Sequence, residues 1–572
     1  MKKLMSLIIA LLLIFSFAGC GGTQSGDEAD PTKTQLYIGA YNGGHGSAWM
    51  YELAERFEKK FANYSFEDGK TGVEVNISDN NTTYNGDYLV NNIDTLSAEV
   101  IFTLVANYGT LVRQNRLYDI TDIVKENLSE KFGENATIES KINPKMREFL
   151  TSVGEKDHYY ALPHTDGLFG INYNVDLFES RLWYFSDDPN DTDGFINSAS
   201  DKRSPGPNGV YDYDPQDPNK VTDDGLPATY EEFYRLCRKI DESNEIIPIT
   251  WAGNAIQYTT IALQNLVFDG MREENLKRVF DSEGSLTGTV VGGDLSNIEN
   301  GTITPADGWK VYQNEALYDA LSFYEQIIDN GWYVTAEKAG SVDDLNFDSA
   351  YTHLRAQSDF VLTGHRNGGI QVAMLVDGSY WESEASTAFK TLENYGSDKY
   401  TARYAFMPFP KSSAEKAGGV TKVSGGESFA FINNNIAPEK VEVATTFLQF
   451  AYTNESLGQF TVVSGTTKDV DYTLTDEQYE NLSYFEKSVW TARKEAVAVP
   501  GVSTSPLFIN KSARFSYYIN LSANIGNDSY INPVSAFRDG YSAKQYFDAI
   551  GSKMTAASWR STFSQELEAL GL

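Results

Sequence analysis

Residues Leu36–Phe61 read LYIGAYNGGHGSAWMYELAERFEKKF, and this stretch decides the fold. Apolar side chains at alternate positions predict a β-strand over 36–41, because a strand repeats every two residues. A glycine-rich turn follows over 42–47. Beyond the turn an apolar side chain recurs at every fourth position, which predicts an amphipathic helix whose stripe comprises Trp49, Leu53, Phe57 and Phe61.

Two further strands are predicted outward from this helix, over 72–78 and 98–103. Strand, helix and strand in this order predict a parallel α/β lobe, because such crossovers are right-handed. The glycine-rich turn lacks the G-x-G-x-x-G spacing of a dinucleotide site. The Gly-Lys-Thr at 69–71 has Tyr64 where a nucleotide loop needs glycine. We therefore expect an α/β fold with no nucleotide site at this turn.

Length and composition restrict the class of protein further. A chain of 572 residues is long enough for two or more domains or one large multi-lobed body. Its hydrophobic content of 41% and aromatic content of 13% support a globular core. A net charge of −33 argues against binding to nucleic acid and to anionic lipid, both of which attract basic surfaces.

The N-terminal stretch Met1–Gly22, MKKLMSLIIALLLIFSFAGCGG, has the features of a secretory signal. A cysteine directly after small residues resembles the bacterial lipobox, in which the peptide is cut before the cysteine and the cysteine is lipidated. Phe17 stands where leucine is usual. We predict a signal peptide over 1–19, then the lipidated Cys20 and a flexible linker over 20–34. The alternative is an uncleaved anchor helix; both interpretations place the body at the extracellular face of the cell membrane.

A long irregular segment over 181–226 carries many aspartates, prolines and glycines, and predicts a surface insertion. Asp188, Asp191 and Asp193 are candidate calcium ligands. An EF-hand with Gly194 at its sixth position fails, because it would begin at Pro189. A solvated loop without metal is the default, and an irregular calcium cage is the alternative.

A capping box of Thr229 and Glu232 predicts a helix directly after this insertion. Cys237 lies on the apolar face of that helix and is expected to be an inert core residue. If Cys20 carries lipid, Cys237 has no cysteine left to pair with, since the chain has two.

The order of segments resembles the extracellular family 1 solute-binding lipoproteins of bacterial ABC importers, which include maltose-binding protein. The similar segments are 36–49, 115–122, 160–164, 171–178, 226–233, 372–381, 406–410, 425–427 and a helix opened by Pro438. The resemblance implies a two-lobed α/β fold of the periplasmic-binding-protein type, with a hinge and an interlobe ligand cleft. One lobe would comprise 35–164 and 421–490, and the other 165–420 and 491–572.

The same resemblance implies a function and its partners. The protein would capture a carbohydrate, in particular an oligosaccharide, and deliver it to the permease subunits of an ABC transporter. It would act as a monomer, without a cofactor and without nucleic acid.

Sugars are held by aromatic faces and by planar polar groups, which this family places on loops at the lips of the cleft. The candidate ligand-binding residues are Tyr41, Asn42, His164, Asp166, Trp251, Asn254, Asp377, Trp381, Gly426 and Glu427. For each the alternative is a structural role, because a tryptophan in a large protein is often a core residue. Trp49 lies on the apolar helix stripe, so core packing is favoured for it.

An enzyme is the second class to consider. A secreted glycoside hydrolase needs two carboxylates about 5 to 10 Å apart, and 79 acidic residues leave room for such a pair. The sequence contains no His-Glu-x-x-His zinc motif and no G-x-S-x-G nucleophile elbow. We expect a binding protein and not an enzyme.

Overall fold

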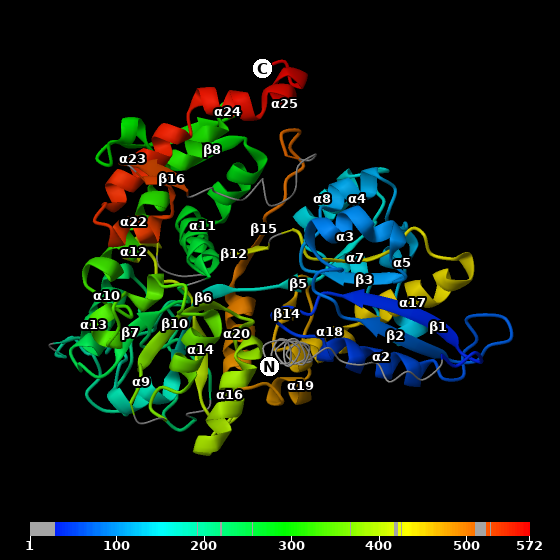
Figure 1. Cartoon of the computed structure of the whole chain (residues 1–572), viewed down its shortest axis with the longest axis horizontal. Helices are drawn as coiled ribbons and strands as arrows, with labels where there is room; N and C mark the ends of the chain where they lie inside the picture. The colour runs from blue at the N-terminus through cyan, green and yellow to red at the C-terminus, as the bar shows by residue number, and fades with distance from the viewer. Residues whose placement is uncertain are drawn as a thin grey trace, which may run out of the picture.

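The computed structural model describes residues 29–572, apart from 192, 218–219, 254, 366–367, 417–420, 425, 509–521 and 527. The predicted signal peptide, Cys20 and most of the predicted linker lie outside the described residues. Figure 1 shows two lobes side by side with connecting segments between them. Within the described part of the chain, no helix combines the length and the hydropathy that crossing a membrane requires.

Lobe 1 is built on a five-stranded sheet of order β2-β1-β3-β13-β4. Its strands are β2 (Val73–Ser78), β1 (Thr34–Ala40), β3 (Val100–Thr103), β13 (Phe429–Ile432) and β4 (Leu162–Pro163). β1 runs parallel to β2 and β3, and β13 returns antiparallel to β3. The predicted strand, helix and strand are confirmed.

Helix α2 (Ala48–Lys60) covers this sheet with the predicted apolar stripe, since Trp49, Leu53 and Phe57 are all buried. Two helices from much later in the chain, α17 (Val441–Ala451) and α18 (Asn454–Ser464), pack against it. The core of lobe 1 therefore joins the first strand–helix unit to residues about 400 positions away.

Lobe 2 is built on a four-stranded sheet of order β11-β6-β10-β7. Its strands are β11 (Tyr404–Met407), β6 (Phe169–Asn174), β10 (Val372–Gly378) and β7 (Ile247–Thr250). β10 is parallel to β7 and antiparallel to β6, and every residue of β10 is buried. The carboxyl ends of β7 and β10 therefore lie at the same edge of the sheet.

Four helices pack against the lobe 2 sheet or against one another beside it. They are α10 (Tyr230–Asp241), α11 (Ile256–Asp281), α12 (Glu315–Asp329) and α14 (His353–Val361). The predicted capping box of Thr229 and Glu232 is present at the start of α10. Cys237 is fully buried in the core, as predicted, and burial raises the pKa of its thiol.

Several short elements lie between the two lobes in Figure 1 and connect them. Strand β5 (Thr165–Asp166) pairs with β14 (Thr467–Lys468), and β12 (Thr421–Ser424) pairs with β15 (Val497–Pro500). Helix α20 (Tyr484–Glu495) has side chains in the cores of both lobes. The exact lobe boundaries stay a prediction.

The predicted insertion over 181–226 contains no helix or strand beyond the end of α9 (Val175–Arg181) in its described residues. The buried side chain of Arg203, which is 4% exposed, holds the insertion against α9. The Arg203 guanidinium lies 3.6 Å from the ring centre of Tyr184 and 3.7 Å from that of Tyr213. It also donates to Glu179 at 2.9 Å, so one cation anchors the insertion to α9.

Candidate binding site between the lobes

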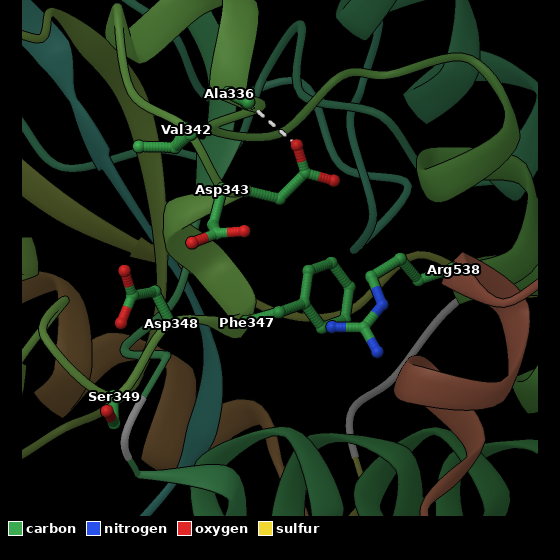
Figure 2. Close-up of a pocket in the computed structure, with 8 residues that line it drawn as sticks. Ala336, Val342, Asp343, Phe347, Asp348, Ser349 and Arg538 are labelled. Atoms are coloured by element: carbon green, nitrogen blue, oxygen red, sulfur yellow. Dashed lines mark hydrogen bonds between the residues drawn. The ribbon is translucent and has the colours of Figure 1, made fainter.

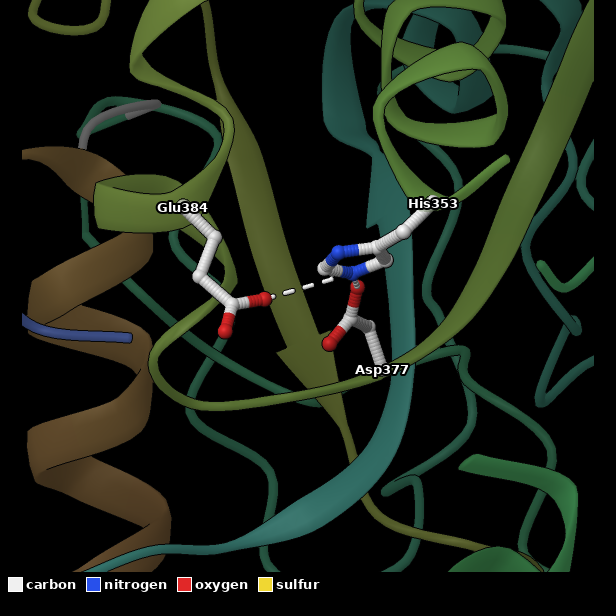
Figure 3. A group of neighbouring side chains, drawn as sticks. All are labelled: His353, Asp377 and Glu384. Carbon is white, nitrogen blue, oxygen red and sulfur yellow. Dashed lines mark hydrogen bonds and ion pairs between the residues drawn. The ribbon is translucent and has the colours of Figure 1, made fainter. Parts of the chain in front are cut away.

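Three polar side chains meet at the carboxyl edge of the lobe 2 sheet. His353 begins α14, Asp377 lies near the end of β10, and Glu384 ends the short helix α15 (Trp381–Glu384). Figure 3 shows the Glu384 carboxylate to the left of the imidazole and the Asp377 carboxylate below it, both near the same ring nitrogen. His353 Nε2 lies 3.4 Å from Asp377 Oδ2 and 3.2 Å from Glu384 Oε2.

Gln357 completes this group, one helical turn after His353 on α14. Its Nε2 lies 2.7 Å from His353 Nε2, and 3.4 Å from both Asp377 Oδ2 and Glu384 Oε2. The Gln357 side chain is fully buried, and its Oε1 has no hydrogen-bond partner. We call His353, Gln357, Asp377 and Glu384 the His353 cluster.

Burial and the close carboxylates change the acidity of this cluster. Burial and the Asp377 charge raise the pKa of Glu384 to about 7. Burial lowers the pKa of His353, but the hydrogen bond to Asp377 and the charges of Asp377 and Glu384 outweigh it and raise that pKa. The cluster therefore holds protons near neutral pH that separate side chains in water would have released.

Aromatic rings lie beside the cluster on lobe 2. The Tyr258 ring centre is 4.7 Å from that of His353, and its hydroxyl donates to Glu384 Oε2 at 3.1 Å. Phe169 and Tyr380 lie 5.9 Å and 6.5 Å from the Tyr258 ring. All three aromatic residues are partly exposed. Apolar faces and polar groups therefore meet in one place.

A loop of lobe 1 faces this cluster from the other side. It follows β1 and contains Tyr41, Asn42 and Gly44. A Cβ atom at Gly44 would lie 3.5 Å from Glu384 Oε1. Burial, and next the Glu384 charge, raise the pKa of the Tyr41 phenol. The lobes also touch nearby, where Ser383 donates to the carbonyl of Ser464 at 2.7 Å.

Of the candidate residues from the sequence, Tyr41, Asn42 and Asp377 lie at this interlobe face. The backbone N–H of Asn42 donates to Asn81 at 2.8 Å, and its side chain donates to Asp79 at 3.2 Å. Asp377 accepts from the backbone of Gly378 at 2.7 Å through the oxygen that does not face His353. Asn254 lies outside the described residues.

The two candidate tryptophans lie in the core of lobe 2. Trp381 is fully buried, with four aromatic rings 5.0–5.5 Å away: Phe360, Phe389, Tyr404 and Phe485. Trp251 is 1% exposed, and its indole N–H donates to the carbonyl of Asn346 at 2.9 Å. In this structure neither indole offers a free face to a sugar.

Three further candidates, Asp166, Gly426 and Glu427, lie at the connection between the lobes. Asp166 is buried and makes an ion pair with Lys422, while Arg493 Nε lies 3.9 Å from the same carboxylate oxygen. Glu427 is buried, and its carbonyl accepts from Ala106 at 2.9 Å. Gly426 has a φ of +60°, a conformation that favours glycine.

His164 lies in an aromatic pocket of lobe 1 beside the buried Lys468. Lys468 Nζ is 2.5 Å from His164 Nδ1. Four rings surround the amine at 4.5–5.3 Å: Trp49, Phe102, Tyr452 and Phe460. Burial lowers the pKa of Lys468 well below its ordinary value, and burial and Lys468 lower that of His164. Trp49 is a buried core residue, the role that its position on the apolar stripe of α2 predicted.

His45 borders the same pocket and makes the stability of the fold sensitive to acid. Burial, then the Lys468 charge, lower the pKa of His45 to about 3. The unfolded chain therefore binds the His45 proton more readily below about pH 6.5, so stability falls as the pH drops. From pH 7.5 to 5, His45 alone is expected to reduce the free energy of unfolding by about 2 kcal/mol.

Urea denaturation at both pH values, on wild type and His45→Phe, measures this loss. The variant is expected to lose about 2 kcal/mol less on acidification than wild type does, because it has no imidazole to protonate there. An equal loss in both proteins would show that His45 is not the acid-sensitive group.

The candidate calcium ligands in the insertion have protein partners. Asp188 accepts from Asn190, Asp191 accepts from Asn197 at 2.7 Å, and Asp193 pairs with Lys239 at 2.7 Å. A different acidic group, Asp212, Asp223 and Asp224, has oxygens within 4.8 Å of one another. Burial raises the pKa of Asp223 to about 7. A calcium ion on the insertion stays a prediction.

A pocket of about 640 Å³ opens beyond Trp251 on lobe 2. Figure 2 shows the carboxylates of Asp343 and Asp348 on one side and the Arg538 guanidinium near the Phe347 ring on the other. The Phe347 ring also lies 6.0 Å from Trp251, just after β7. The pocket is lined by residues of 336–349 and by Arg538, whereas the His353 cluster is built from α14, β10 and α15.

His353, Gln357, Glu384 and Tyr258 were not among the residues predicted from sequence. Only a weak signal existed for the first two, a polar pair four residues apart at the start of a helix. Glu384 follows the Asp377–Trp381 segment by three residues and could have been included with it. Tyr258 reaches the cluster from α11, 126 residues before its partner Glu384.

Comparisons with known proteins agree with this architecture. The profile of the family described as bacterial extracellular solute-binding protein matches residues 40–457. A search of curated proteins finds no match. Among solved structures, RafE from Streptococcus pneumoniae in its apo form has 12% sequence identity and a TM-score of 0.52, covering 93% of this chain and 100% of its own.

Two other solved structures have the same two-lobed arrangement. A chitin oligosaccharide binding protein is 14% identical with a TM-score of 0.50, covering 91% of this chain and 98% of its own. A protein from a study of xylan utilization by Caldanaerobius polysaccharolyticus is 11% identical with a TM-score of 0.52, covering 91% and 100%. The chain belongs to the family of bacterial extracellular solute-binding proteins.

Proposed function

We propose that this protein captures a carbohydrate, in particular an oligosaccharide, between its two lobes and delivers it to the permease of an ABC importer. The observation that carries the proposal is the interlobe face itself. There the His353 cluster and Tyr258 of lobe 2 face the Tyr41 loop of lobe 1. Sugars need both polar partners for hydroxyl groups and aromatic faces for C–H groups, and both are present at this face.

The relatives support a carbohydrate as the ligand class. Their names and titles mention a chitin oligosaccharide and xylan utilization. The protein would work as a monomer held to the outer face of the membrane by lipid on Cys20, without enzymatic activity of its own.

A thermal-shift screen of the full chain against chito-, xylo- and raffinose-type oligosaccharides tests the ligand class. A ligand at 100 times its Kd is expected to stabilise the fold by about 2.7 kcal/mol, because it binds only the folded state. Tyr395→Ala, an exposed residue at 49%, is a control that should shift as wild type does. If no oligosaccharide of the panel raises the melting temperature, the proposed ligand class is contradicted.

The glycoside hydrolase alternative is tested with the same sugars. Product analysis after prolonged incubation is expected to show every oligosaccharide intact. Release of shorter sugars, lost in a carboxylate variant, would favour the hydrolase.

A further inference from the structure

Three groups lie close to His353 Nε2, and hydrogen bonds alone do not explain all three contacts. A ring nitrogen either carries a proton or offers one lone pair. If it accepts from the Gln357 amide at 2.7 Å, it offers no proton to Asp377 or Glu384. If it carries a proton, that proton faces the Gln357 N–H groups. With the Gln357 amide in this orientation and both carboxylates ionised, no protonation state of His353 satisfies all three neighbours.

The fully buried Gln357 shows a second conflict. Its Nε2 faces three other groups of the cluster, whereas its Oε1 has no hydrogen-bond partner. The two ends of a side-chain amide have the same shape, so a half turn exchanges them. That turn places an oxygen beside His353 Nε2, Asp377 Oδ2 and Glu384 Oε2.

Most distances in this cluster match the shell of a small cation, whereas the 2.7 Å between His353 Nε2 and the Gln357 amide is shorter. Two ligand atoms at about 2.1 Å from one Zn²⁺ lie about 3.4 Å apart when the geometry is tetrahedral. The separations from His353 Nε2 to the two carboxylates are 3.4 and 3.2 Å, and those from the Gln357 amide are 2.7, 3.4 and 3.4 Å. The two carboxylate oxygens lie within 4.8 Å of each other.

We propose that His353, Gln357, Asp377 and Glu384 bind a divalent transition-metal ion of the zinc type at the interlobe face. One imidazole nitrogen among three oxygens suits Zn²⁺, whereas Ca²⁺ takes six to eight oxygens. Surrounding groups fix the ligands: Tyr258 donates to Glu384 and the Gly378 N–H to Asp377. The ion joins α14, β10 and α15, and it lies opposite the Tyr41 loop.

Isothermal titration of the full chain with ZnCl₂ after chelator treatment, without any sugar, tests this site. We expect one Zn²⁺ per chain, at least tenfold weaker binding for Glu384→Gln and a similar loss for His353→Phe. Glu393→Gln removes an exposed carboxylate from the same lobe and is expected to bind as wild type does. Thermal melts without metal check that Glu384→Gln is folded.

X-ray absorption at the zinc edge gives an independent measurement. One imidazole nitrogen among oxygen ligands is expected, and it should disappear in His353→Phe. Zinc binding that is lost in Asp223→Asn but kept in Glu384→Gln would place the ion on the insertion and overturn the proposal. So would binding of Ca²⁺ without Zn²⁺, or no metal binding. Because no sugar is added, these outcomes are independent of the proposed carbohydrate ligand.

Discussion

Replacing Trp381 by alanine is expected to lower the free energy of unfolding by about 3–5 kcal/mol, because the change leaves a large cavity in a packed core. The indole is fully buried, and the rings of Phe360, Phe389, Tyr404 and Phe485 surround it. Urea denaturation of the ligand-free protein measures the loss. Trp381→Phe keeps an aromatic ring in this place and is expected to cost less.

The control is Tyr395→Ala, on the surface of the same lobe, which is expected to change stability by less than about 0.5 kcal/mol. If Trp381→Ala leaves the ligand-free stability unchanged but abolishes a sugar-induced thermal shift, Trp381 is a ligand platform and not a core residue. The two roles are therefore separated by one variant in two measurements.

Asp166→Ala is expected to have a comparable effect, about 3–5 kcal/mol, because it leaves the buried Lys422 amine with only the more distant Asp469 carboxylate, at 3.9 Å. The side chains of Asp166 and Lys422 are 1% and 6% exposed. Arg493 also faces this carboxylate at 3.9 Å. The residues come from β5, β12 and α20, all of which connect the lobes.

A second variant distinguishes this charge effect from a packing effect. Adding Lys422→Met to Asp166→Ala removes the buried amine that has lost its close partner and is expected to recover a large part of the lost stability in denaturation experiments. A loss below about 1 kcal/mol for Asp166→Ala would contradict the role given to the pair. No recovery in the double variant would do the same.

The fold was predictable where local patterns specify it. The alternation at 36–41 and the stripe of Trp49, Leu53 and Phe57 gave a strand and a helix at the observed places, because both patterns depend only on neighbours in sequence. The Thr229–Glu232 capping box is equally local. The pairing of β13 with β3 and the packing of α17 and α18 on lobe 1 depend on residues hundreds of positions apart. The family resemblance indicated only that the segment 421–490 belongs to lobe 1.

The candidate site was predictable in part, for the same physical reason. Tyr41, Asn42 and Asp377 follow or end strands, and strand ends at one sheet edge are where polar loops converge. His353 and Tyr258 reach Asp377 only because α14 and α11 pack at that edge. The sequence did not distinguish Trp381 as a core residue from Trp381 as a ligand platform, since both roles need a large aromatic side chain after a buried strand.

Isothermal titration of the oligosaccharide with the largest thermal shift tests the central claim, that the ligand is held between the lobes. Wild type is expected to bind one ligand per chain. Tyr41→Ala on lobe 1 and Tyr258→Ala on lobe 2 are each expected to weaken binding at least tenfold, a loss of about 1.4 kcal/mol or more. Tyr37→Ala and Tyr395→Ala, which alter exposed tyrosines of the two lobes, should bind as wild type does. Unchanged affinity in either Tyr41→Ala or Tyr258→Ala would contradict a ligand held by both lobes.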